Sequence, residues 1–395
     1  MERFRTPAHL LIAMAFIMAM AFSVWNVLLN NFVVEKAAFT GKEIGMLQSL
    51  REVPGFLAFT AIYLLLFIKE QRFALLFLAV MCLGVAVTGW FPTVWGLYLT
   101  TIVMSIGFHY FETVNQSLTL QWIDKDKSAH FMGQVLAWKG AASLVAYAAV
   151  WLLMEWMAVS YNIVYMLFGF VSLAAVLVLW TIFPSFESPH VQTRKLILRK
   201  RYWLYYGLTF LSGARRQIFI VFAGFMMVEK FGYSVGDVSL LFIINYLFNM
   251  LFAAKIGAWI GRVGERRALT VEYVGLACVF TGYAFVESAT MAGVLYVVDH
   301  LFFAMAIAIK TYFQKIADPE DIASTAGVSF TINHIAAVVI PAALGVVWLY
   351  SPTTVFLVGT GLALGSLTLS RMVPLAPESG NEVSFLGRKR AQDVA

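Results

Sequence analysis

The triplet Val34-Glu35-Lys36 returns as Val228-Glu229-Lys230, at a spacing of 194 residues. Each copy is followed by an aromatic residue, an acid and a new apolar run. The same spacing pairs a distant set of residues in the two halves: Asp124, Gly133, Ala142, Val145 and Ala148 with Asp318, Gly327, Ala336, Val339 and Ala342. One register therefore relates the two halves, which indicates a duplicated bundle of helices.

The composition places the chain in a membrane. Of its 395 residues, 61% are apolar and only 13% are charged, and the mean hydropathy is +0.80, whereas a soluble domain has about a quarter charged residues. A spanning helix needs roughly 20 mostly apolar residues. The sequence therefore predicts an all-α membrane protein with twelve spans, at 8–33, 43–68, 73–91, 94–121, 129–155, 161–184, 203–228, 236–259, 268–286, 291–315, 322–349 and 353–373.

The distribution of Lys and Arg predicts the topology. The odd-numbered loops hold only Lys36, Lys42 and Lys230, whereas the termini and the even-numbered loops hold most of the other cations. By the positive-inside rule both termini are expected to be cytoplasmic. The net charge of +6 then reflects topology and anionic lipid headgroups, not nucleic acid. The first apolar run lacks an Ala-x-Ala-like cleavage site, so it is expected to be retained as a helix.

The repeat predicts the domain organisation. We expect an N-terminal six-helix bundle at 1–187, a basic cytoplasmic linker at 188–201, a C-terminal six-helix bundle at 202–374 and a polar, mobile cytoplasmic tail at 375–395. Cys82 and Cys278 both fall within spans, so they are expected to be small packed residues and not a disulfide.

Charges inside the spans predict which helices are central. An ionisable side chain in a span costs roughly 2.5–3.5 kcal/mol on insertion scales and therefore faces the bundle interior or a water-filled path. Apart from Arg371 at the edge of the twelfth, the third, sixth and twelfth spans have none, and the ninth has only Glu272 near one end. These four spans are expected to face lipid.

This pattern, with twelve spans and a half-length repeat, resembles the major facilitator superfamily. The local signature is Gly257-Ala258-Trp259-Ile260-Gly261-Arg262-Val263-Gly264-Glu265-Arg266-Arg267. It is similar to the family's Gly-x-x-x-Asp-Arg-x-Gly-x-Arg-Arg loop, with Gly261 in place of Asp. The resemblance implies two pseudo-symmetric bundles around a central cavity lined by helices 1, 4, 7 and 10. It also implies a cytoplasmic latch formed by Gly257, Arg262, Gly264, Arg266 and Arg267.

Two departures from the family pattern bear on the substrate. The equivalent loop of the first half, 68–72, has lost the Gly and Asp-Arg elements. The fifth span, around Lys139, lacks the Gly-Pro-rich motif of the family's proton-driven drug antiporters. Typical multidrug export is therefore disfavoured.

Polar residues at helical spacing predict the binding site. Ser105, His109, Glu112 and Gln116 share one face of the fourth span, and the repeat carries this face to Asp299 and Lys310 in the tenth. We interpret Glu112 and Asp299, with Glu52 third, as proton-coupling carboxylates. The alternatives are that Glu112 pairs with Lys139 and that Lys310 extends to the interface. Arg51 could instead cap the external vestibule.

Two adjacent guanidinium groups, Arg215 and Arg216, lie near the middle of the seventh span. Neighbouring helical residues diverge by about 100°, so one is expected to face the cavity and the other an interhelical partner. Arg216 shares a face with Ser212 and Thr209, which favours it for the cavity, although an ion pair with Asp299 is the alternative. A guanidinium stays charged and suits carboxylate or phosphate oxygens.

Amides and imidazoles complete the predicted lining. They either bond a polar solute or join helices, and they are Asn26, Asn30, Asn245, Asn249, Asn333 and His334.

The leading hypothesis is a secondary active transporter, proton-coupled, for a small polar solute that carries an anionic group. The cations Arg51, Lys139, Arg215, Arg216 and Lys310 outnumber the three acids. One alternative is export of an amphipathic compound or of a divalent metal bound by His109, Glu112, Asp299, His300 and His334, although the nearby cations would repel a dication.

The alternative from another class is a non-transporting receptor or an embedded enzyme. The chain shows no Ser-His-Asp order and no Gly-rich phosphate loop, so no enzymatic activity is expected. The expected partners are a small-molecule substrate, protons and membrane lipids, without a cofactor, a metal or nucleic acid. The chain is expected to act as a monomer in a bacterial inner membrane.

Overall fold

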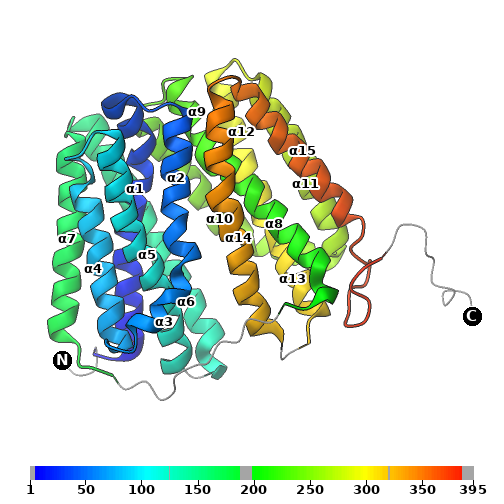
Figure 1. Cartoon of the computed structure of the whole chain (residues 1–395), viewed down its shortest axis with the longest axis horizontal. Coiled ribbons are helices and arrows are strands. Elements are labelled where there is room, and N and C mark those ends of the chain that lie inside the picture. Colours follow the sequence, from blue (N-terminus) through cyan, green and yellow to red (C-terminus); the bar gives the residue numbers. More distant parts are fainter. Residues whose placement is uncertain (1–4, 124, 187–197, 319–320, 385–395) are drawn as a thin grey trace, which may run out of the picture. The chain divides into compact units, whose positions relative to one another are not determined.

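The computed structural model describes residues 5–123, 125–186, 198–318 and 321–384. These residues are almost entirely helical, and no strand occurs among them beyond an isolated bridge between Glu378 and Asn381 (Figure 1). Backbone contacts divide the chain into two compact units. Unit 1 comprises 1–193 and 225–246, and unit 2 comprises 194–224 and 247–395. The predicted linker lies outside the described residues at 188–197, and the tail at 385–395.

The helices of unit 1 come mainly from the first half of the chain. They are α1 (Pro7–Ala37), α2 (Gly41–Phe56), the 3₁₀ turn η2 (Ala58–Thr60), α3 (Ala61–Leu64), α4 (Glu70–Thr88), α5 (Val94–Trp122), α6 (Lys125–Trp151), the π-helix η3 (Leu152–Trp156), α7 (Tyr161–Ile182), most of α9 (Gly224–Glu229) and the first turns of α10 (Val235–Val263).

The helices of unit 2 follow the linker. They are the 3₁₀ turn η4 (Lys200–Tyr202), α8 (Trp203–Gln217), the π-helix η5 (Ile218–Ala223), the rest of α10, α11 (Glu265–Phe285), α12 (Ala289–Phe303), the 3₁₀ turn η6 (Ala304–Ala306), α13 (Ile307–Ile316), α14 (Ile322–Trp348) and α15 (Pro352–Ser370).

The helices pack in equivalent pairs within the two units, as the repeat predicts. In unit 1, α1 packs on α6 and α7, and α4 packs on α5 and α7. At the repeat spacing the equivalent helices of unit 2 make the same pairs, since α8 packs on α14 and α15, and α11 packs on α12 and α15. Each half of the repeat thus specifies the same internal arrangement.

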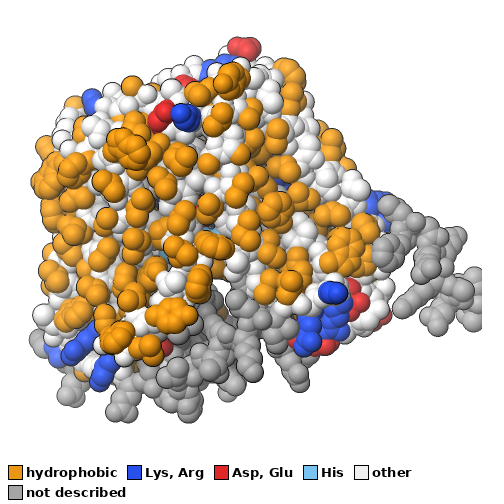
Figure 2. Space-filling view, viewed as in Figure 1, with side chains coloured by type: hydrophobic (Ala, Val, Ile, Leu, Met, Phe, Trp, Pro, Cys, Tyr) orange, Lys and Arg blue, Asp and Glu red, His pale blue; other side chains and the backbone are white. Residues whose placement is uncertain are grey.

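In the described part of the chain, 11 helices are long and apolar enough to cross a membrane. Figure 2 shows hydrophobic side chains over most of the visible face, with charged side chains near its edges. The second predicted span, 43–68, is absent from these 11 helices. Its helix α2 ends at Phe56, and the chain continues as η2 and α3. Pro54 lies inside α2 and cannot donate a backbone hydrogen bond, which explains the weakness of the helix at this point.

Close helix approaches in unit 1 depend on glycine. A Cβ at Gly107 of α5 would lie 2.3 Å from the backbone nitrogen of Met81 in α4, and a Cβ at Gly169 of α7 would lie 2.4 Å from the backbone of Ala86. No side chain fits at such distances. These two positions therefore fix how α5 and α7 pack on α4.

The described part of the tail makes hydrogen bonds to other parts of unit 2. The backbone N–H of Ser384 donates to the carbonyl of Met372 at 2.8 Å, and the Tyr312 hydroxyl donates to the carbonyl of Glu382 at 2.5 Å. Nearby in unit 2, Arg199 donates to both carboxylate oxygens of Asp321 at 3.2 Å. The first two bonds join the tail to the end of α15 and to α13, and the bonds of Arg199 join the residues before α8 to the start of α14.

Candidate functional site

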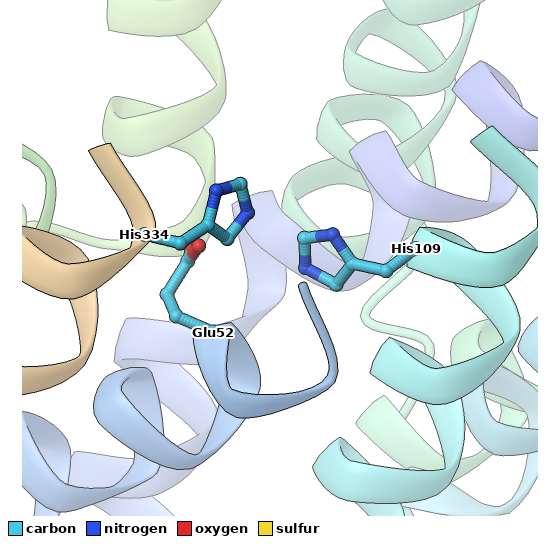
Figure 3. Close-up of side chains that lie close together, drawn as sticks. All are labelled: Glu52, His109 and His334. Atoms are coloured by element: carbon cyan, nitrogen blue, oxygen red, sulfur yellow. The ribbon is translucent and has the colours of Figure 1, made fainter. Parts of the chain in front are cut away.

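In unit 1 the polar side chains predicted on α2 and α5 come together. Arg51 donates to Glu52 at 2.5 Å, and each residue is 8% exposed. The Ser105 hydroxyl of α5 donates to the Arg51 carbonyl, which ties the two helices together. A carboxylate oxygen of Glu52 lies within 4.8 Å of a ring nitrogen of His109, which is also buried. Figure 3 shows the Glu52 side chain extending from α2 and the His109 side chain from α5.

The Glu112–Lys139 pair joins α5 to α6. The Lys139 ammonium donates to Glu112 at 2.7 Å, and the two side chains are 25% and 34% exposed. This is the pairing that the sequence left open for Glu112. The pair is therefore only partly buried.

The other predicted residues of unit 1 occupy different environments. Asn30 of α1 is buried, Asn26 is half-buried and Gln116 of α5 is exposed. Asn245, in the part of α10 that belongs to unit 1, is 2% exposed and its side-chain oxygen has no hydrogen-bond partner in the described structure. These amides do not form one cluster with the ion pairs in the contacts that the structure shows.

Unit 2 encloses a charged cluster built from α8 and α11. Arg215 is 2% exposed and Glu272 is 1% exposed, and their charged groups lie 3.7 Å apart. The Arg215 guanidinium also lies 4.3 Å from the centre of the Tyr273 ring, a cation–π contact. Glu272 was expected at the end of a lipid-facing helix, so that expectation is wrong for this face of α11. The pairing needs α8 packed on α11, which helix periodicity alone does not predict.

Asp299 of α12 belongs to the same buried environment. It is 0% exposed, and neither of its carboxylate oxygens has a hydrogen-bond partner among the described residues. Arg215 lies within electrostatic range of it. The interior of unit 2 therefore holds two acids, Glu272 and Asp299, around one guanidinium.

The second guanidinium of the adjacent pair has a different environment. Arg216 is exposed where Arg215 is buried, as expected for neighbours that diverge by about 100°. Arg216 lies within electrostatic range of His300, whose ring nitrogen is 2.8 Å from the Asn249 amide. Lys310 of α13 is exposed as well.

The helix α14 contributes the last two predicted residues. Asn333 is exposed. A Cβ added at Gly213 of α8 would lie only 2.5 Å from the side-chain oxygen of Asn333. His334 is buried, with Nδ1 at 2.9 Å from the carbonyl of Phe330. Gly213 therefore permits a close approach of α8 and α14.

The signature loop joins α10 to α11 in unit 2. Gly264 has φ of 84°, a left-handed conformation that favours glycine, and this ends α10. Arg262 donates to the carbonyl of Ala258 at 3.4 Å. Arg262 and Arg267 are exposed, Arg266 is half-buried, and Gly257 has open space around it. Glu265 of the same signature is buried, and its carboxylate forms an ion pair with the Lys315 ammonium at 2.7 Å.

The structure adds three residues that were not predicted. Glu272 is one, and Asn31 and Glu155 are the others. Asn31 is fully buried and its amide donates to the carbonyl of Tyr233 at 2.7 Å, while Glu155 accepts from the Gly236 N–H at 2.8 Å. The sequence held two signals for these residues. Asn31 is a polar residue next to the predicted Asn30, and Glu155 is an acid at the end of a predicted span.

A divalent-metal site needs several ligands, and four is usual for zinc. In unit 1, the described ligand-type groups that lie together are Glu52 and His109. In unit 2, His300 bonds Asn249, and Asp299 lies inside the charged cluster. Taken separately, the described residues of neither unit bring the five residues of the metal hypothesis together.

The sequence pattern of the Major Facilitator Superfamily matches residues 10–341. A curated relative is an uncharacterized MFS-type transporter of Methanocaldococcus jannaschii, 24% identical over 222 residues, which are 51% of this chain and 55% of the relative. The chain thus spans about half the length of the curated relative that it matches.

Solved structures share the fold over nearly the whole chain. The nucleoside transporter NupG superposes with a TM-score of 0.71 at 17% identity, covering 92% of this chain and 98% of NupG, and a mutant form gives 0.76. A bacterial homolog of the human lysosomal transporter Spinster, inward-facing and occupied, gives 0.69 at 13% identity, covering 96% of this chain and 98% of the homolog. At such identities the likeness concerns the fold alone.

Proposed function

Because the chain belongs to the Major Facilitator Superfamily, we propose that it is a secondary active transporter for a small polar solute with an anionic group, coupled to protons. The observation that carries the substrate class is a pair of exposed cations in unit 2, Arg216 and Lys310. The proposed topology has both termini in the cytoplasm of a bacterium, in keeping with the positive-inside rule.

The charge balance supports an anionic group. Away from the helix ends, the charged residues of unit 1 form matched pairs, Arg51 with Glu52 and Lys139 with Glu112. The equivalent parts of unit 2 contain four cations and two acids, namely Arg215, Arg216, Lys255, Lys310, Glu272 and Asp299. A substrate with a carboxylate or phosphate group would offset this excess, and a guanidinium can bind such a group through two hydrogen bonds.

The buried acids support coupling to protons. An ionised carboxylate without a hydrogen-bond donor is costly in an apolar interior, and Asp299 has no such partner among the described residues. We infer that Asp299 carries a proton in this conformation and releases it when the surroundings change. Glu112 is the second candidate, since its pairing with Lys139 is partly exposed and can exchange. Glu52, paired with Arg51, is the third.

A neutral solute is the second candidate. The superposed NupG structures are of a nucleoside transporter, and amides such as Asn26, Asn30 and Asn245 can bond a neutral polar molecule. A nucleoside therefore belongs in the same assay as the organic anions.

The test is uptake into proteoliposomes with an imposed pH gradient, over labelled organic anions, organic cations, sugars and nucleosides. We expect accumulation of an anion that is lost in Arg216→Ala and Lys310→Gln. Arg216→Lys keeps the charge but loses the planar fork, so it should reduce affinity less than Arg216→Ala. Arg5→Gln, which removes an exposed cation that precedes α1, is the matched control. Uptake of a neutral or cationic solute, with affinity unchanged in the Arg216 and Lys310 variants, would overturn the proposed substrate class.

A further inference from the structure

One segment packs with the unit opposite to its place in the repeat. Residues 225–246 correspond by the 194-residue spacing to 31–52, which lie in unit 1 with the rest of the first half. By the repeat, 225–246 would be expected in unit 2, yet they pack in unit 1. The packing of this segment is therefore an asymmetry that the repeat does not predict.

The first contact that holds the segment is between Glu155 and the start of α10. The Glu155 carboxylate, in the π-helix η3, accepts a 2.8 Å hydrogen bond from the Gly236 N–H. This N–H is in the first turn of α10, where backbone donors lack a partner within the helix and a negative charge is favourable. The carboxylate thus satisfies a donor and interacts with the helix dipole.

Gly236 is shaped for this contact. A Cβ built there would lie 2.2 Å from Cγ and 2.5 Å from the carboxylate carbon of Glu155. An alanine would therefore displace the Glu155 side chain. Beside the contact is a cavity of about 460 Å³ lined by Trp151, Glu155, Trp156, Ser234, Gly236, Asp237 and Leu240. The contact between Glu155 and Gly236 thus lies at the edge of this cavity.

Two further contacts hold the same segment. The Asn31 amide of α1 donates to the carbonyl of Tyr233 at 2.7 Å. On α6, the Tyr147 ring lies 5.2 Å from Phe242 and 5.4 Å from Tyr246, measured between ring centres. The segment is thus bonded at its loop and packed along the first turns of α10.

The chain crosses between the units beside an irregular helix. The π-helix η5, Ile218–Ala223, ends immediately before the crossing at Gly224 and Phe225. Its wider turns interrupt the regular hydrogen bonding of the α-helix, and such π-helical segments occur frequently at functional sites. The second crossing, between Tyr246 and Leu247, lies inside the continuous helix α10.

We propose that Glu155 is a positioning residue that holds Phe225–Tyr246 in unit 1, and that the segment leaves unit 1 by a hinge at η5 during transport. The proposal rests on the proposed transport function. Release of the Gly236 N–H would free the start of α10 from η3.

The test measures release of the segment directly. Ser239, on α10 within the segment, is 0% exposed, so a thiol at this position reacts with a maleimide only when the segment leaves unit 1. Ser239→Cys is introduced after Cys82→Ala and Cys278→Ala, and the labelling rate is measured on the full-length purified protein. A hydrogen bond to a charged group contributes enough to predict at least a roughly tenfold faster rate in Glu155→Ala.

Gly236→Ala should increase the rate similarly, because its Cβ displaces Glu155. In the double variant Glu155→Ala/Gly236→Ala the added methyl has room, so its rate should match that of Glu155→Ala alone. Gly140→Ala, on α6 with nothing within 4 Å of its added Cβ, is the control and should leave the rate unchanged.

A second thiol separates release of the segment from unfolding. Ser366 of α15 is 0% exposed in unit 2, and Ser366→Cys should label equally slowly in all backgrounds. An unchanged rate at position 239 in Glu155→Ala, or a parallel increase at position 366, would overturn the proposal. The labelling needs no substrate, so its failure would leave the proposed substrate class untouched, and failure of the uptake assay would leave the hinge untouched.

Discussion

Arg215→Met should destabilise the protein strongly, because it removes one partner of a buried ion pair. The Arg215 and Glu272 side chains are each 2% exposed and their charged groups are 3.7 Å apart. Unit charges at that distance attract by about 4–5 kcal/mol at an effective dielectric constant of about 20. Much of this attraction only offsets the cost of burying the two groups. Removing one partner therefore leaves the buried charge of Glu272 without compensation, at roughly 3–5 kcal/mol.

A double variant tests whether the lost stability comes from the uncompensated charge of Glu272. In Arg215→Met/Glu272→Gln neither residue carries a charge, so most of the lost stability should return, leaving a deficit of about 1–2 kcal/mol from the cation–π contact with Tyr273. Unfolding by sodium dodecyl sulfate in mixed micelles, followed by tryptophan fluorescence, gives the free energies for a double-mutant cycle. Glu265, which is buried and paired with Lys315 in the same unit, provides a comparison pair with a more exposed cation.

Two results would refute this reasoning. The first is an Arg215→Met protein as stable as the parent, which would mean that the guanidinium is hydrated and not buried. The second is a double variant as unstable as Arg215→Met alone, which would assign the loss to packing and not to charge.

The remaining predictions concern packing, acid stability and coupling. Gly107→Ala forces α5 away from the backbone of α4 and should cost roughly 1–3 kcal/mol, seen as a lower thermal midpoint. Arg199 donates hydrogen bonds that lower the pKa of Asp321 below the ordinary 3.8. The stability from this contact is complete above that pH and is lost as the pH falls through the lowered pKa, so Asp321→Asn should show a shallower loss of stability in acid. Asp299→Asn and Glu112→Gln should abolish accumulation driven by a proton gradient while sparing exchange, and full accumulation in the double variant would exclude both residues as the coupling site.

Much of the fold follows from the sequence. Apolar runs of about 20 residues predict spans because the interior of a bilayer accepts only backbone that is hydrogen-bonded within itself. The 194-residue spacing predicts equivalent packing in the two halves, and the pairs of α1 with α6 and of α8 with α14 show it. Some helix ends can also be predicted from the sequence, since Pro54 lies close to the end of α2.

The partners of the charged residues are less predictable. Helical spacing places His109, Glu112 and Gln116 on one face and separates Arg215 from Arg216, because these relations lie within one helix. Helical spacing did not decide whether Glu112 pairs with Lys139, and the structure shows that it does. It missed Glu272, because a residue near a helix end looks the same in sequence whether it faces lipid or the neighbouring helix.

The sequence by itself determined the membrane environment, the repeated spans and the positions of the costly charges, since these depend on composition and on contacts close along the chain. The tertiary structure decided which charges are paired, and that Asp299 lies without a hydrogen-bond partner among the described residues. It also decided that 225–246 pack in unit 1. Such features depend on contacts such as Asn31 with Tyr233 and Glu155 with Gly236, which join residues far apart in the chain. No local periodicity encodes them, because they form only once the helices have packed.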